Sequence, residues 1–283
     1  MKYNKIELER KVHQMKFTKF TSGKHQDFLL ISDVHFDSKK CDRKLLKKHL
    51  DKAMEKDAAI IIVGDWFDIM ATNDDRRGTK DLIRDEYMGG NYIDLIIKHS
   101  ANFLAPYAKN IFMISEGNHE SAIRKYKETD ILDRLVERIN MSTGSRIFRG
   151  GYSGYILLNF QCSNFNGINR SKTIHYHHGH EGGRRSKGTL AIDTDMAKWN
   201  ADIYISGHSH HKWHFPMSRE EISTNGIIRQ KDIHHLRLGS YKKLDEFGGW
   251  GIEKKFEQPR LGGYWIKAYL ESSEIKIDVT EAH

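Results

Sequence analysis

Residues 27–35 read DFLLISDVH, a short apolar run that leads directly into an aspartate and a histidine. A run of this length, without helical spacing, predicts a strand buried on both faces. Residues 58–68 (AAIIIVGDWFD) and residues 110–120 (NIFMISEGNHE) repeat the arrangement. Each of the three predicted strands therefore ends in side chains of the types that bind metal ions.

Helical segments separate these strands. Residues 42–56 place leucine, alanine and methionine at helical spacing on a basic surface, and further helices are expected around 80–104 and over 121–139. Strand and helix therefore alternate as in a parallel sheet with both faces covered.

The second half of the chain changes character. It contains several predicted strands but only one clear helix, at about 189–199. The predicted strands cover residues 152–160, 172–178, 202–206, 234–238, 264–270 and 274–279. We therefore expect an α/β fold with two packed mixed sheets flanked by helices, the second sheet more antiparallel than the first.

The bulk properties suit one large domain. We expect residues 26–283 to form it, and residues 1–25, which are polar and weakly periodic, to form a short helix or arm leading into it. No apolar run is long enough to span a membrane, and the N-terminal residues lack the apolar region of a secretory signal. Two distant cysteines, Cys41 and Cys162, fit free thiols in a reducing cytoplasm.

Charge and histidine content indicate the class of ligand. The formal net charge is +8, which favours an anionic partner such as nucleic acid, a nucleotide or an acidic lipid headgroup. The 17 histidines are clustered, and clustered histidine beside aspartate is typical of a metal site.

Five predicted strand ends carry the candidate site. They read DVH at 33–35, GDWFD at 64–68, GNHE at 117–120, HYHHGH at 175–180 and GHSH at 207–210. Because ligands of α/β sheets gather beyond the carboxyl ends of strands, we expect these groups around one crevice. Two metal ions about 3.5–4 Å apart can bind phosphate oxygens and generate hydroxide at neutral pH. Mixed carboxylate and imidazole ligands suit manganese, iron, zinc and similar ions.

In their order, these motifs resemble those of the calcineurin-like metallophosphoesterases: D-x-H, G-D-x-x-D, G-N-H-E, H-G and G-H-x-H, over residues 33–210. The resemblance implies two packed sheets, two divalent metal ions and phosphoester hydrolysis. It implies that one metal ion is held by Asp33, His35, Asp65 and His210, and the other by Asp65, Asn118, His178 and His208. Manganese is expected, with iron, zinc, nickel or magnesium as alternatives. A metal-bridging hydroxide would attack, and His119 would contact the phosphate and protonate the leaving oxygen.

Departures from the pattern indicate the branch of the family. Ile69 and Met70 follow Asp68, where the serine/threonine phosphatases carry Arg-Gly. Trp66 and Phe67 offer no tyrosine ligand of the purple acid phosphatase type, and His119 is present where lipid-A precursor hydrolases lack a histidine. The nearest resemblance is to the nuclease-like and phage-encoded group.

Several assignments have alternatives. Asp68 is assigned to catalysis, or to orienting a ligand histidine. His178 is chosen as the ligand of its cluster because it ends the strand before a glycine, whereas His180 lies near the site or on a solvated turn. Basic loops follow two of the motifs and predict either phosphate binding or solvated surface. The substrate-binding candidates are Arg76, Arg77, His180, Arg184, Arg185 and Lys187.

These observations favour a metal-dependent phosphodiesterase that acts on nucleic acid or nucleotides. One alternative is a phosphomonoesterase that acts on proteins or small metabolites. Another is a catalytically inactive scaffold of the same fold, which the presence of His119 disfavours. The sequence leaves the oligomeric state open.

Overall fold

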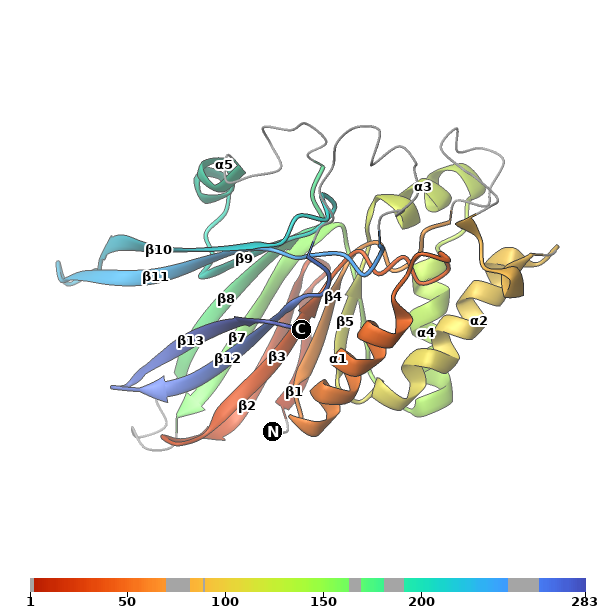
Figure 1. Ribbon diagram of the computed structural model, residues 1–283. Helices are drawn as coiled ribbons and strands as arrows, with labels where there is room; N and C mark the ends of the chain where they lie inside the picture. The colour runs from red at the N-terminus through yellow and green to blue at the C-terminus, as the bar shows by residue number, and fades with distance from the viewer. Residues whose placement is uncertain (1–2, 70–81, 89, 163–168, 181–190, 244–259) are drawn as a thin grey trace.

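The computed structural model describes residues 3–69, 82–88, 90–162, 169–180, 191–243 and 260–283. Two mixed β-sheets pack face to face, and helices flank them (Figure 1). The six-stranded sheet has the order β13-β12-β3-β4-β5-β6, and the seven-stranded sheet has the order β1-β2-β7-β8-β9-β11-β10. The predicted fold class is confirmed.

The six-stranded sheet contains the parallel strands predicted in the first half. Its strands are β3 (His25–Ile31), β4 (Ala59–Val63), β5 (Ile111–Ser115), β6 (Phe148–Gly150), β12 (Tyr264–Glu271) and β13 (Glu274–Glu281). β3 to β6 pair in parallel, so their carboxyl ends meet at one edge, while β12 and β13 pair antiparallel.

The seven-stranded sheet combines the two N-terminal strands with five strands from the second half of the chain. Its strands are β1 (Tyr3–Glu9), β2 (Val12–Phe20), β7 (Ser153–Cys162), β8 (Asn169–His177), β9 (Ile203–Ser206), β10 (Trp213–Ile222) and β11 (Ile228–Arg237). β8 and β9 pair in parallel, which brings their carboxyl ends to the same edge of this sheet.

Each buried strand of the six-stranded sheet contributes side chains to two hydrophobic cores, one on each face of the sheet. Side chains alternate between the faces of a strand. In β4, Ile60 and Ile62 pack toward the helices, while Ile61 and Val63 pack between the sheets. Strands that are buried on both faces explain why these segments appear in the sequence as continuous apolar runs.

Four of the described helices cover the outer face of the six-stranded sheet (Figure 1): α1 (Arg43–Glu55), α2 (Tyr92–Leu104), α3 (Asn118–Lys127) and α4 (Ile131–Thr143), with short 3₁₀ turns η2 (Asp85–Tyr87) and η3 (Ala105–Tyr107). A further helix, α5 (Ala191–Lys198), lies beside the seven-stranded sheet. α1 buries Leu46, Leu50 and Ala53 at helical spacing. No helix among the described residues has the length and apolarity needed to cross a membrane.

Some predicted elements are wrong in extent or type. The helix expected around 80–104 begins only at Tyr92, after η2. The helix expected over 121–139 is two helices, because Glu128 adopts a left-handed conformation and Asp130 caps the start of α4. Residues 3–20 form β1 and β2 rather than a helix; β2 buries alternate side chains such as Met15 and Phe17. The division of the chain at residue 25 stays a prediction.

Candidate metal centre

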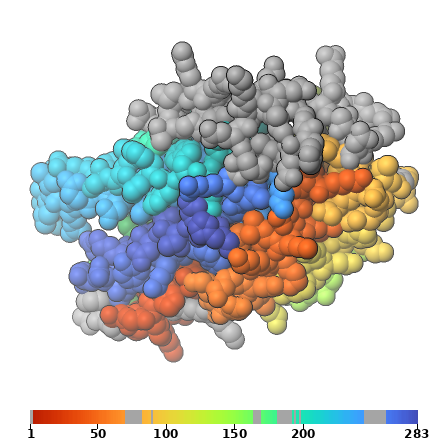
Figure 2. All heavy atoms as spheres, in the orientation of Figure 1, coloured from red at the N-terminus to blue at the C-terminus, as the bar shows by residue number. Residues whose placement is uncertain are grey.

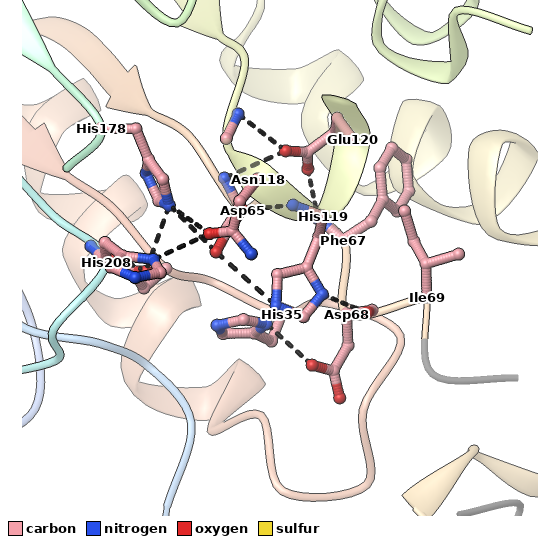
Figure 3. Close-up of polar contacts among 12 residues, drawn as sticks. His35, Asp65, Phe67, Asp68, Ile69, Asn118, His119, Glu120, His178 and His208 are labelled. Carbon is pink, nitrogen blue, oxygen red and sulfur yellow. Dashed lines mark hydrogen bonds and ion pairs between the residues drawn. The ribbon is translucent and has the colours of Figure 1, made fainter. Parts of the chain in front are cut away.

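The candidate ligands lie at the shared edge where parallel strands of both sheets end. Asp33 and Asp65 follow β3 and β4, and Asn118 begins α3 after β5. His178 follows β8, and a further pair of histidines follows β9: His208 and His210. Figure 3 shows side chains from these separate segments pointing toward one another.

The backbone of this edge is unusual. Five of the seven candidate ligands have a positive φ angle: Asp33 (51°), His35 (50°), Asp65 (49°), His208 (67°) and His210 (58°). Residues other than glycine rarely adopt this conformation, and such strain concentrates at functional sites. The turns after the strands therefore have a strained backbone, and this conformation directs the side chains of the candidate ligands.

One group of ligand atoms is formed by Asp33, His35 and His210. Nε2 of His35 lies 3.2 Å from Nε2 of His210, and that nitrogen lies 3.4 Å from Oδ1 of Asp33. Asp33 is fixed by its neighbours, since it accepts hydrogen bonds from the Ser32 hydroxyl at 2.5 Å and the His208 amide at 3.0 Å. These contacts leave a small space ringed by nitrogen and oxygen atoms.

A second group is formed by Asp65, His178 and His208. Nε2 of His178 lies 3.0 Å from Oδ2 of Asp65. The amide oxygen of Asn118 lies 3.1 Å from Nε2 of His178 and 2.8 Å from Nδ1 of His208. Asn118 therefore belongs to this group.

The two groups form one continuous cluster. Asp65 stands between them, because it also groups with His35 and His119. Nε2 of His178 reaches to 3.9 Å from Oδ1 of Asp33, across the boundary between the groups. Asp65 therefore lies where the two groups meet and could contribute to either, and all seven candidate ligands share one site.

The outward-facing Nδ1 contacts of two imidazoles suit a metal-binding donor set. Nδ1 of His35 lies 2.9 Å from Oδ1 of Asp68, and Nδ1 of His178 lies 3.2 Å from the carbonyl oxygen of Val63. An Nδ1–H that donates to an acceptor leaves the lone pair on Nε2. In that state both Nε2 atoms point into the cluster, toward the carboxylates of Asp33 and Asp65, where they could bind a cation.

The pKa shifts of the candidate ligands also indicate a site that favours positive charge. Burial raises the pKa of Asp65, but His178 and His119 outweigh burial and hold that pKa well below its usual value. Burial lowers the pKa of His35 to about 4, so this imidazole is neutral at neutral pH. Burial also lowers the pKa of His178, but the carboxylate of Asp65 raises it to about 10. The buried carboxylates therefore favour positive charge at the place where a metal ion would lie.

Asp68 contacts the cluster from outside. Its carboxylate meets Nδ1 of His35 and also accepts hydrogen bonds from Nζ of Lys242 at 2.6 and 2.8 Å. Its carbonyl oxygen lies 2.5 Å from Nδ1 of His119. This geometry favours the alternative in which Asp68 orients a ligand histidine; its role stays a prediction.

His119 lies at the first turn of α3, beside the cluster. Its amide donates to Oδ1 of Asp65 at 3.1 Å, and its Nε2 lies 3.8 Å from Oδ2 of the same carboxylate. Burial lowers the pKa of His119, but Asp65 and Asp68 outweigh burial and raise it. The imidazole is thus held by Nδ1 while Nε2 faces the candidate ligands.

Glu120 holds the two loops of the site together. Its carboxylate accepts hydrogen bonds from the amides of Gly117 at 2.9 Å, Phe67 at 2.9 Å and Asp65 at 3.2 Å (Figure 3). Burial and the charge of Asp65 raise the pKa of Glu120 to about 7. Glu120 is the third residue of α3, the position of a capping glutamate, but the predicted helix began at residue 121 and no role was predicted for Glu120.

The sequence analysis missed three further residues that shape the site. The carboxylate of Asp37 accepts hydrogen bonds from the amides of Asp68 at 2.6 Å and Ile69 at 2.9 Å, and from the hydroxyl of Tyr92. Lys242 holds Asp68 from the loop after β11. Asp37 could have been suspected from its place two residues after His35, but nothing local in the sequence marks Tyr92 or Lys242.

The remaining predicted site residues lie elsewhere. His180 is exposed, its ring lies 6.3 Å from that of His177, and it belongs to none of the three ligand groups. The other substrate-binding candidates fall outside the described residues: Arg76, Arg77, Arg184, Arg185 and Lys187.

The calcineurin-like phosphoesterase family matches residues 27–212, a range that contains every candidate ligand. The chain belongs to the calcineurin-like phosphoesterase family. The resemblance drawn from the motifs is thereby confirmed, and so is its coarse consequence, a phosphoesterase-family domain with residue groups that could hold metal.

Solved structures with a similar fold have low identity to the chain. A predicted phosphoesterase of Streptococcus pneumoniae is 13% identical, with a TM-score of 0.35, 92% of this chain covered and 91% of that one. A metallophosphoesterase of Sphaerobacter thermophilus is 13% identical, with a TM-score of 0.38 and coverages of 91% and 90%. Vps29 of Entamoeba histolytica, complexed with zinc, is 10% identical, with a TM-score of 0.31 and coverages of 91% and 100%. A comparison with curated proteins found no match. Nothing about function follows from likenesses this low.

Proposed function

We propose that this protein is a two-metal phosphodiesterase that hydrolyses phosphodiester bonds of nucleic acid or nucleotides. The observation that carries the proposal is the cluster of seven nitrogen and oxygen ligands around Asp65, four of which are buried. A basic chain, with a formal net charge of +8, supports an anionic substrate.

The ligand groups suggest how metal ions would be held. One ion would bind Asp33, His35, Asp65 and His210, and the other would bind Asp65, Asn118, His178 and His208. When bound, the ions supply Lewis acidity toward the phosphate oxygens and an activated water. Mixed carboxylate, amide and imidazole donors suit manganese, with iron, zinc, nickel and magnesium as alternatives.

His119 would act as the general acid. Its Nδ1–H is held by the carbonyl oxygen of Asp68, which fixes the ring and leaves Nε2 toward the substrate side of the cluster. The raised pKa of His119, caused by Asp65 and Asp68 against the effect of burial, favours the protonated ring. That proton can pass to the leaving oxygen.

The local contacts would preserve this arrangement. Asp68 and Lys242 hold His35, and Glu120 ties the loop after β4 to the start of α3. We keep a cytoplasmic location as part of the proposal, because both cysteines, Cys41 and Cys162, are free thiols buried in the fold.

Hydrolysis of bis(4-nitrophenyl) phosphate by the purified protein with added manganese tests the proposal. We expect turnover with manganese, none in EDTA, and loss of at least about a hundredfold in Asp65→Asn. The matched control is Asp85→Asn, which removes an exposed carboxylate from η2. Absence of turnover with every divalent metal would refute the proposal, and faster turnover of 4-nitrophenyl phosphate would replace it with a phosphomonoesterase.

A further inference from the structure

Four lysines form a stripe along α1. Lys44, Lys48 and Lys52 occupy the helix, and Lys56 follows it, each exposed and four residues from the next. Residues four apart lie on the same face of a helix. The rise of about 1.5 Å per residue then spaces these ammonium groups about 6 Å apart. We call these four residues the lysine stripe.

The lysine stripe borders a groove of about 780 Å³. The opposite wall comes from the C-terminal strands, with Trp265 of β12 and Glu281 of β13. Figure 2 shows the orange atoms of α1 meeting the dark blue atoms of these strands on the face in view. None of the residues that line the groove is a candidate metal ligand, so the groove is separate from the metal centre.

Positive charge is concentrated at this helix. Residues 43–56 contain six basic and two acidic side chains, a net of +4 and half of the formal charge of the whole chain. The two acidic side chains are already engaged: Asp51 pairs with Lys47 at 2.7 Å and Glu55 pairs with Lys52 at 2.8 Å. Exposed pairs of this kind are weak and rearrange easily.

Lys44 and Lys48 carry the least compensated charge. Within the part of the chain that the structure describes, neither forms an ion pair. Like charges four residues apart destabilise a helix. An anion with several charges, lying along the groove, would relieve this repulsion.

Trp265 adds an aromatic surface beside the lysine stripe. The side chain is only partly buried, and Nζ of Lys56 lies 5.4 Å from the centre of its ring. Lysines that follow a backbone of phosphates, together with an aromatic ring on which a base can stack, are the features of single-strand binding sites. A membrane surface fits less well, because the groove is concave and its apolar ring is recessed among charges.

We infer that the groove between the lysine stripe and Trp265 binds a single nucleic-acid strand, through its phosphates and one stacked base. The inference names a polynucleotide as the substrate class of the proposed phosphodiesterase, and it rests on the proposed function in that respect. Strand binding in the groove would not require metal ions.

The test is binding of a fluorescein-labelled oligothymidylate or oligouridylate, followed by fluorescence anisotropy in EDTA. We expect the unmodified protein to bind and the double variant Lys44→Gln/Lys48→Gln to bind about tenfold more weakly at moderate salt. Its slope of log affinity against log salt should become shallower by about 1.4, since each lost contact on a single strand removes about 0.7. Trp265→Leu should weaken binding by about tenfold without changing the slope.

The charge-matched control is Lys98→Gln/Lys109→Gln, which removes two exposed lysines that do not line the groove. Equal binding by this control and by the lysine-stripe variant would overturn the inference, as would absence of strand binding by the unmodified protein. Binding to phosphatidylserine vesicles in place of the oligonucleotides would also overturn it. Turnover of bis(4-nitrophenyl) phosphate by the unmodified protein, measured separately, distinguishes failure of the inference from failure of the proposed function.

Discussion

At the scale of the residue, His119 is held by a series of hydrogen bonds that begins outside the set of candidate ligands. The carboxylate of Asp37 accepts hydrogen bonds from the amides of Asp68 and Ile69. The carbonyl oxygen of Asp68 in turn forms a hydrogen bond with Nδ1 of His119. The hydroxyl of Tyr92, a residue of α2, donates a further hydrogen bond to the carboxylate of Asp37. A chain of hydrogen bonds therefore runs from a distant helix to the proposed general acid.

The proposed acid role of His119 predicts a dependence on the leaving group. His119→Asn should slow hydrolysis of a dinucleotide, whose leaving oxygen needs a proton, by about 10²–10⁴-fold. Hydrolysis of bis(4-nitrophenyl) phosphate should slow much less, because nitrophenolate leaves without protonation. Comparison of kcat for the two substrates measures this, with His25→Asn, an exposed histidine, as the control. Equal losses on both substrates would contradict the acid role.

Tyr92→Phe removes one hydrogen bond from Asp37 and leaves the rest of the tyrosine ring in place. The free energy of unfolding should fall by about 1–2 kcal/mol, because a buried carboxylate loses a donor. Urea denaturation in EDTA measures the change. Tyr126→Phe, which alters an exposed tyrosine, should leave it unchanged; a Tyr92→Phe variant as stable as the unmodified protein would show that the bond contributes nothing.

The sequence was enough to select the candidate ligands, which the structure brings together, but not the residues that orient them. The ligands stand next to apolar strands and within short motifs, so local spacing was enough to select them. Tyr92 and Lys242 lie far along the chain from Asp37 and Asp68, and meet them only through tertiary packing. Contacts of that kind leave no local pattern to read.

At the scale of the element, the strands with two buried faces were the easiest to predict. β3, β4 and β5 appear as apolar runs because each face packs into a different core. β10 was not predicted. It is a largely exposed edge strand that contains Pro216, so its sequence shows little of the apolar pattern by which strands were identified. β6 was missed because it is only three residues long.

The break between α3 and α4 was missed because apolar spacing continues across it. The side chain of Asp130 accepts a hydrogen bond from the amide of Asp133 at 2.9 Å and also pairs with Arg149 at 2.8 Å. Asp130→Ala should therefore lower the free energy of unfolding by about 1 kcal/mol, the usual cost of losing a helix cap. Urea denaturation tests this against Glu137→Ala, an exposed change on the same helix; equal stabilities would argue against the cap.

At the scale of the whole molecule, two sheets that are distant in sequence contribute strand ends to one edge. The six-stranded sheet supplies Asp33, Asp65 and Asn118, and the seven-stranded sheet supplies His178 and the histidines after β9. Packing of the two sheets therefore creates the site, and the hydrophobic core between them fixes the positions of their strand ends relative to each other. Burial of histidines is a cost of this arrangement.

One buried histidine predicts acid sensitivity of the metal-free protein. His49 lies on the buried face of α1 with its Nδ1 2.7 Å from the hydroxyl of Tyr241, and burial lowers its pKa to about 4. In the unfolded chain its pKa is about 6.5, so the unfolded state binds the proton first and stability falls as pH drops from about 6.5 toward 4. In EDTA, His49→Gln should flatten this fall in urea titrations, while His25→Gln should not; parallel curves for all three proteins would refute the assignment.

The central claim is that seven side chains from both sheets bind a pair of divalent ions, with Asp65 shared between them. Equilibrium dialysis of the metal-free protein against manganese tests it most directly, with Asp65→Asn dialysed in parallel. We predict two manganese ions per chain, and a severe loss of both in the variant. A stoichiometry of zero or one, or unchanged binding of both ions by Asp65→Asn, would contradict it.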